Sequence, residues 1–175
     1  EPGCIEAVRK TASLFPNDIL QPTILNEDGS VQNKGLDWMW PAYSLANKEN
    51  TLNTDLFTTA AFCMSKSTFR TVGEFDVKFA PAYYEDMDYS FRAKAKKFNL
   101  RVLELAKVRH IGSYSFSKVK SKKEISKLCR DHRRYFINKN FKGGDRLIRL
   151  TVSCVMDVMK ESFDIVRKWG ASENE

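Results

Sequence analysis

The sequence of 175 residues lacks the features that would place it among secreted, zinc-binding or membrane-spanning proteins. Its four cysteines are spread along the chain without a Cys-x-x-Cys pair, which argues against a disulfide framework and against metal ligation by cysteine. No apolar run reaches the ~18 residues that a membrane-spanning helix needs, and no signal peptide leads the chain. We therefore expect reduced thiols and a cytoplasmic location.

The length is sufficient for one domain with a real core, but not comfortably for two. Residues 1–10 place proline and acidic residues early and basic residues later, which is typical of a helix that begins just after a strand has ended. We interpret the chain as a piece of a larger protein.

Basic residues are concentrated in one segment. Residues 117–149 hold 12 Lys and Arg against 3 Asp and Glu, an excess of 9, whereas the net charge of the whole chain is +7. A nucleic-acid-binding or anionic-membrane-binding module is therefore an alternative, although the segment lacks the regularly interleaved aromatic residues of nucleic-acid readers. We expect nucleic acid not to be a partner.

Two amphipathic helices are predicted in this C-terminal region, separated by a break at Phe141-Lys-Gly-Gly-Asp145. We expect the apolar stripe of the second helix to pack on its own domain. Pairing with another helix and adsorption to an anionic membrane surface are the alternatives. The residues of this stripe are Ile148, Val152, Val155, Met156, Met159, Phe163 and Val166.

The pattern ahead of that region predicts an α/β fold, with part of a mixed sheet and flanking helices. Pro22 argues for a strand at a sheet edge or for a strand end, and Gly73 is a natural helix stop. Strands are predicted over residues 19–25, 56–65 and 100–106, and helices over residues 66–72 and from Glu85 onward.

Residues 82–92 are the stretch most typical of a functional site. Glu85, Asp86 and Asp88 suit the first turn of a helix, where unpaired amides favour negative charge. Asp88 stands one helical turn before Arg92, so we assign it a structural ion pair. A helix N-terminus would hold Asp86 ionised, and an ionised carboxylate facing a cleft can accept a proton from an attacking hydroxyl. The alternative is that Glu85 and Asp86 are ordinary N-terminal helix charges.

Other candidate residues have a functional and an ordinary interpretation. Trp38 and Trp40 could form a stacking wall for a sugar ring, or they could plug an edge of the core. The small residues Thr59 and Ala60 would let a ligand approach the backbone, or they could simply pack closely. His110 alone does not define a metal site, and by itself is more typical of a hydrogen-bonded structural residue.

Three motifs occur in order at tight spacing, and together they resemble the C-terminal half of a family 2 glycosyltransferase of the GT-A fold. This group contains many rhamnosyltransferases and other polysaccharide-building enzymes. The resemblance covers roughly residues 1–142. It is carried by Val72-Gly-Glu-Phe-Asp76, Tyr84-Glu-Asp-Met-Asp-Tyr-Ser-Phe-Arg92 and Val108-Arg-His-Ile-Gly-Ser113, with support from the segments 21–32 and 133–140.

The resemblance implies a partial GT-A fold, with residues 1–116 as its acceptor-side half and residues 117–175 as a basic helical extension. It implies inverting transfer of a sugar from a nucleotide-sugar donor to a glycan or lipid-linked acceptor. Asp86 would be the catalytic base, and Glu85 would bind or orient the acceptor or the base. His110 would approach Mg or Mn, whose other ligands belong to an Asp-x-Asp motif that does not stand ahead of residue 1 in this sequence.

The resemblance also places Tyr84 among the substrate-binding residues. Ser113, Ser115 and Lys118 are placed to close over a diphosphate through hydrogen bonds and charge, and a flexible solvated loop is the alternative. Lipid-linked acceptors are frequent in this family, which supports peripheral binding at the inner face of the membrane. An inactive, truncated transferase is a further alternative.

Overall fold

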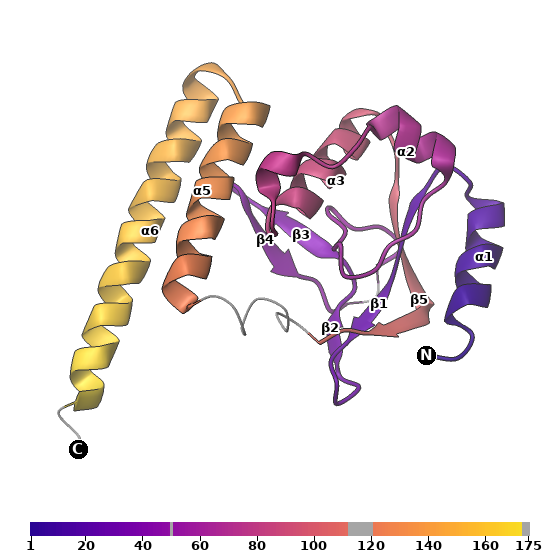
Figure 1. The fold of residues 1–175 in the computed structure, drawn as a ribbon, viewed down its shortest axis with the longest axis horizontal. Helices are drawn as coiled ribbons and strands as arrows, with labels where there is room; N and C mark the ends of the chain where they lie inside the picture. Colours follow the sequence, from indigo (N-terminus) through magenta and orange to yellow (C-terminus); the bar gives the residue numbers. More distant parts are fainter. Residues whose placement is uncertain (50, 112–120, 173–175) are drawn as a thin grey trace.

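A computed structural model describes residues 1–49, 51–111 and 121–172, with residues 161–172 described by their backbone alone. The described chain is a mixed α/β fold of two small sheets and five α-helices, two of which follow the sheets at the C-terminal end (Figure 1). The strands are β1 (Ile19–Leu25), β2 (Val31–Asn33), β3 (Leu36–Met39), β4 (Tyr43–Ala46) and β5 (Leu100–Arg109). The helices are α1 (Cys4–Leu14), α2 (Lys66–Val72), the 3-10 helix η1 (Val77–Phe79), α3 (Glu85–Ala95), α5 (Lys122–Asn140) and α6 (Gly143–Ser172).

The larger sheet has the strand order β2-β1-β5, so β1 is its central strand, parallel to β5 and antiparallel to β2. The predicted bounds of this strand are confirmed, but its predicted position at a sheet edge is wrong. Pro22 fits a central strand here because β2 pairs only with Ile24 and Leu25, and the register with β5 shifts just after Pro22. A residue without an amide hydrogen is tolerated where the ladder is interrupted.

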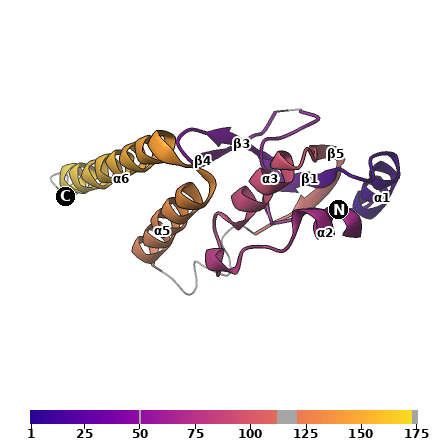
Figure 2. The ribbon, with the colours of Figure 1, turned by 90° about the horizontal axis from the view of Figure 1, so that it is seen from above.

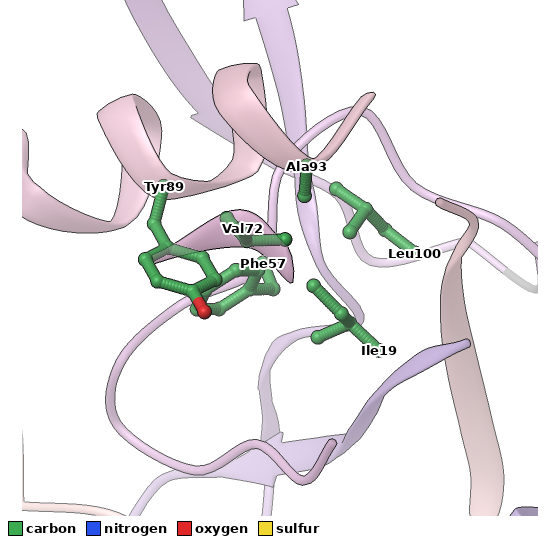
Figure 3. Close-up of a cluster of buried hydrophobic side chains, with 6 residues drawn as sticks. All are labelled: Ile19, Phe57, Val72, Tyr89, Ala93 and Leu100. Atoms are coloured by element: carbon green, nitrogen blue, oxygen red, sulfur yellow. The ribbon is translucent and has the colours of Figure 1, made fainter. Parts of the chain in front are cut away.

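Successive residues of β1 point to opposite faces of the sheet and fill two cores. Ile19 packs with Tyr89 and Ala93 of α3 and with Val72 of α2 (Figure 3). Its neighbour Leu20 packs instead with the α1 side of the sheet, in a cluster with buried Cys4 and Leu103 of β5. Helix α1 therefore covers one face of the sheet, and α2 and α3 cover the other.

The predicted strand over residues 56–65 is wrong. The backbone of this segment pairs with strand residues through isolated bridges and not through a ladder, from Leu56 to Leu36 and from Cys63 to Leu20, with a turn in between. Leu56 and Phe57 are fully buried, so the apolar residues of this segment fill the core without forming a ladder. The turn brings residues 58–60 to the wall of the cavity described below.

Other predicted elements are confirmed. Helix α2 ends at Val72, and Gly73 follows it with a φ of 93°, a left-handed angle that glycine adopts without strain. Helix α3 begins at Glu85, as the acidic first turn predicts. Strand β5 begins at Leu100 and runs on to Arg109, beyond its predicted end.

Helices α5 and α6 form an antiparallel pair beyond the two sheets, with α6 on the outer side (Figures 1 and 2). Helix α5 is held to the rest of the fold by a third apolar cluster, which contains its buried residues Phe136 and Ile137. The predicted packing of the α6 stripe is wrong for the side chains that the structure describes. Ile148, Val155, Met156 and Met159 are exposed and Val152 is half-buried, while the side chains of Phe163 and Val166 lie outside the described part.

Within the described ranges, no helix combines the length and the apolar character that crossing a membrane requires. All four cysteines are free thiols, as the sequence predicts.

Candidate functional site

A cavity of about 920 Å³ lies between the sheets and the C-terminal helices. Its walls come from β2, β4, the turn at residues 58–60, the start of α3, the end of β5, and one side of α5 and α6. We call it the central cavity. The predicted site residues that line it are Thr59, Ala60, Tyr84, Glu85, Asp86 and His110.

Both tryptophans of the predicted stacking wall lie away from the central cavity. Trp38 packs in the cluster that holds α5, with its ring centroid 5.6 Å from that of Phe91, as the core-plug interpretation requires. Trp40 is 49% exposed, with the guanidinium carbon of Arg149 5.9 Å from its ring centroid. The remaining predicted residues, Ser113, Ser115 and Lys118, lie outside the described residues.

The chain enters α3 through two consecutive residues in the left-handed conformation. Tyr83 and Tyr84 have φ angles of 72° and 75°, which side chains other than glycine rarely adopt. The hydroxyl of Tyr84 donates to the carbonyl oxygen of Ala42 at 2.8 Å, and the carbonyl oxygen of Tyr83 accepts from Nδ1 of His132 at 2.9 Å. Such backbone strain persists only where neighbouring contacts hold it, and here it sets Glu85 at the cavity wall.

One carboxylate oxygen of Glu85 is paired and the other is not. The hydroxyl of Thr59 donates to Oε1 of Glu85 at 2.9 Å. Oε2 is buried and has no hydrogen-bond partner among the residues that the structure describes. A buried polar atom without a hydrogen bond lowers the stability of the fold by about 1–3 kcal/mol. This oxygen is therefore suited to accept a hydrogen bond from a ligand hydroxyl or to coordinate a cation.

Asp86 is a titratable group of the central cavity whose pKa lies well above its ordinary value. Burial raises its pKa from 3.8 to about 7, and the neighbouring charge of Glu85 adds to this rise. The backbone amide of Met87, which donates to Oδ1 at 2.8 Å, acts in the opposite direction but does not offset burial. The helix amides therefore do not keep the pKa of Asp86 in its ordinary range, because the desolvation of the carboxylate outweighs them.

His110 lies where the parallel strands β1 and β5 end. Its backbone amide donates to the carbonyl oxygen of Leu25, the last residue of β1, at 2.9 Å. Its ring Nδ1 lies 3.1 Å from Oε1 of Gln32 on β2. Because an amide oxygen only accepts, Nδ1 carries the proton of the neutral ring, and Nε2 holds the lone pair that a metal ion would use.

The described residues do not form a complete metal site, since they contain no group of three or more His, Cys, Asp or Glu side chains arranged to hold an ion. His110 and the unpaired oxygen of Glu85 are of the kinds that bind Mg or Mn, but two such groups do not fix a cation. A metal ion at this place would need further ligands.

Sequence reasoning missed the polar residues that shape the cavity walls. Gln21, buried in β1, donates to Oδ1 of Asn33 at 2.9 Å and accepts from the backbone amide of Thr58 at 2.8 Å, which fixes the turn that carries Thr59. A glutamine within an apolar strand was the available signal. The missed residues that line the cavity itself include Gln32, Asn33, Tyr43, Tyr83, Cys129, Arg133 and Lys160.

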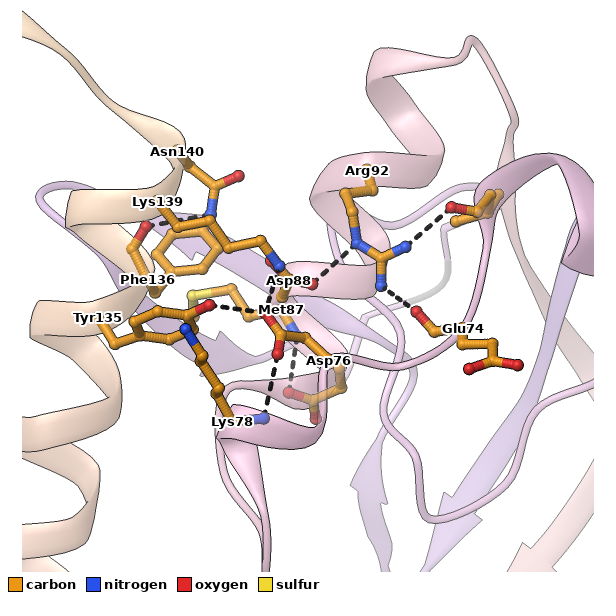
Figure 4. A network of polar contacts seen from close by, with 12 residues as sticks. Glu74, Asp76, Lys78, Met87, Asp88, Arg92, Tyr135, Phe136, Lys139 and Asn140 are labelled. Carbon is orange, nitrogen blue, oxygen red and sulfur yellow. Dashed lines mark hydrogen bonds and ion pairs between the residues drawn. The ribbon is translucent and has the colours of Figure 1, made fainter.

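Helix α3 is anchored to α5 through the charged side chain of Lys139 (Figure 4). The predicted ion pair between Asp88 and Arg92 is confirmed at 2.8 Å, but Asp88 is fully buried and also pairs with Lys139 of α5 at 2.8 Å. Lys139 reaches Asp76 at 2.7 Å, and its hydrogen bond is the main cause that lowers the pKa of Asp76 to about 2. Asp88 is thus the buried centre of a network that fixes the start of α3.

No model of a known protein family matches the chain, and no curated protein matches it. The function must therefore be argued from the central cavity and its chemistry.

Proposed function

We propose that this chain is the acceptor-side part of an inverting glycosyltransferase that uses a nucleotide-sugar donor. The observation that carries the proposal is the position of Asp86, Glu85 and His110 in the wall of one cavity. The cavity lies at the carboxyl ends of β1 and β5, the edge at which open α/β sheets bind their ligands. The acceptor would be a glycan or a lipid-linked sugar.

Asp86 would act as the general base. Its pKa of about 7 suits this role, because a base removes protons best when its pKa lies near the working pH. Asp86 would take the proton from the acceptor hydroxyl while that oxygen attacks the anomeric carbon. The bond between the anomeric carbon and the nucleoside diphosphate would break in the same step, so the configuration of the sugar inverts.

Glu85 would position the acceptor. Its Oε1 is held by Thr59, which leaves Oε2 free among the described residues to accept a hydrogen bond from a sugar hydroxyl. Its charge also contributes to the raised pKa of Asp86, so Glu85 would tune the base as well as orient the alcohol. A divalent cation, Mg or Mn, would neutralise the leaving diphosphate, and His110 would be one of its ligands.

The test is sugar transfer by the Asp86→Asn variant, made in the complete polypeptide that contains this chain. Transfer from radiolabelled nucleotide sugars to the acceptor should fall at least about a thousandfold, because a neutral amide cannot take the proton. Donor binding, measured by calorimetry, should persist. Glu104→Gln is the matched control, since Glu104 is an exposed acid on β5. Near-normal turnover by Asp86→Asn would remove Asp86 from the role of base.

A further inference from the structure

Helix α5 contacts the start of α3 on both sides of Asp86. After it in the chain, Lys139 of α5 pairs with the buried carboxylate of Asp88 at 2.8 Å. Before it, Nδ1 of His132 of α5 lies 2.9 Å from the carbonyl oxygen of Tyr83. Asp86 therefore stands on a short segment that α5 holds at both ends.

The contact before Asp86 acts on a strained part of the backbone. The carbonyl oxygen of Tyr83 belongs to the peptide unit whose orientation sets ψ of Tyr83 and φ of Tyr84. Both residues have left-handed φ angles, 72° and 75°, and such a conformation persists only where neighbouring contacts prevent its relaxation. The hydrogen bond from His132 is a contact of this kind. Relaxation of this turn would change the direction in which the chain enters α3.

The imidazole of His132 is itself held in place. It is only 7% exposed, and its ring meets that of Phe79 edge-on, with the centroids 5.6 Å apart. Phe79 packs in the apolar cluster that also contains Met87 and Phe136. Because a carbonyl oxygen only accepts, Nδ1 carries a proton and donates to Tyr83. A donor whose orientation is fixed by packing can define the position of the group that it binds.

The hydroxyl of Tyr84 makes a second contact, of a different kind. It donates to the carbonyl oxygen of Ala42 and so fixes a side chain of the turn. His132 acts instead on the backbone directly ahead of Glu85 and Asp86. A change at His132 is therefore transmitted to the two acids that line the central cavity.

We propose that His132 is a positioning residue of the central cavity: acting through Tyr83, it holds the start of α3 so that the carboxylate of Asp86 faces the acceptor. The proposal rests on the proposed function for the role of Asp86 as the base, whereas the hold on the turn is a property of the fold alone. It makes α5 part of the site, whereas the resemblance treats residues 117–175 as an extension.

Two substitutions of His132 separate the hydrogen bond from the packing of α5. His132→Leu removes the donor and keeps an apolar side chain at a buried helix position. His132→Asn keeps a donor, because the amide nitrogen of asparagine is attached to Cγ, as Nδ1 of histidine is. Leucine has the higher helix propensity, so a weaker helix cannot explain a defect that appears in His132→Leu and not in His132→Asn.

The first measurement is amide hydrogen exchange in the full chain, followed by NMR. The reporters are the amides of Met87 and Asp88, which make hydrogen bonds in the first turn of α3. The reference is the amide of Ile19, which is hydrogen-bonded at the start of β1. In His132→Leu we expect exchange at the reporters to accelerate at least about tenfold more than exchange at Ile19. His132→Asn should exchange like the original chain.

The second measurement is sugar transfer by the complete polypeptide that contains this chain. In His132→Leu, kcat should fall at least about tenfold while KM for the acceptor changes by less than about threefold, because the base moves and the other cavity walls stay. In His132→Asn, kcat should stay within about threefold of the original value.

Unchanged exchange at Met87 and Asp88 in His132→Leu, or an acceleration that Ile19 shares equally, would overturn the hold on the turn. A kcat that is unchanged in His132→Leu, or that falls equally in His132→Asn, would overturn the positioning role. If the complete polypeptide transfers no sugar with His132 intact, the proposed function fails, and the exchange result still decides whether His132 holds the turn.

Discussion

The raised pKa of Asp86 predicts that the difference in stability between the original protein and the Asp86→Asn variant changes with pH in a defined direction. Between about pH 4 and pH 7 the folded protein keeps a proton on Asp86 that the unfolded chain has already released. The free energy of unfolding of the original protein therefore loses this contribution as pH rises through that window. Asparagine cannot ionise, so the variant does not share the loss.

The size of the effect follows from the two pKa values. The difference between 3.8 and about 7 corresponds to about 4 kcal/mol at 1.36 kcal/mol per pKa unit. Asp86 is half-buried and borders the cavity, so water offsets part of this energy. We expect Asp86→Asn to gain about 2–4 kcal/mol relative to the original protein between pH 4 and pH 8.

The assay is urea unfolding of both proteins at pH 4, 6 and 8, followed by circular dichroism. Only the difference between the two proteins is compared, because every other titrating group is common to both. Glu104→Gln is again the control, since it removes an exposed carboxylate of the same charge. A constant difference across this pH range, or one that favours the original protein at high pH, would refute the assignment of a raised pKa.

Three further predictions concern the supports of the site. Lys139→Met should lower the free energy of unfolding by about 2–4 kcal/mol, because the fully buried Asp88 loses one of its two cations. An unchanged midpoint of urea unfolding would contradict the network. Asp76→Asn should lower the free energy of unfolding by about 1–2 kcal/mol at pH 7. This difference from the original protein should disappear between pH 4 and about pH 2, as the original aspartate is protonated. A difference that does not change with pH would exclude the lowered pKa. Tyr84→Phe should lower the free energy of unfolding, measured by heat or urea, by about 1 kcal/mol, because the hydrogen bond to the carbonyl oxygen of Ala42 is lost. An unchanged free energy of unfolding would show that this bond does not hold the turn before α3.

The elements that sequence predicted well are those with local causes. The acidic turn at Glu85 and the stop at Gly73 depend on residues within a few positions of each other, and the structure has them there. The predicted break at residues 141–145 is shorter than expected, since α5 ends at Asn140 and α6 already begins at Gly143. Pro22 was misjudged because its tolerance in a central strand depends on how far β2 extends, which is not a local property. The prediction of a strand over residues 56–65 was wrong for a related reason, since a short apolar run does not distinguish a strand from a buried loop.

The candidate site was predicted in part. The sequence marked Asp86 and His110, and the fold brings both to the same cavity although they lie far apart in the chain. The raised pKa of Asp86 was not predicted, because the helix terminus is visible in the sequence whereas burial is not. The exposure of the apolar stripe of α6 could not be predicted either. Periodicity shows that a stripe exists, but it does not show that Arg133 contacts Ser153 and Asp157 and so turns the polar side of α6 toward the protein.

The most direct measurement of the central claim is the pH dependence of kcat/KM for sugar transfer by the complete polypeptide. If Asp86 is the base, kcat/KM should be constant above a transition near the pKa of about 7 and fall about tenfold for each pH unit below it. A profile that stays level from pH 5 to pH 8 would contradict the account, since a carboxyl with this pKa would then have no part in removing the proton.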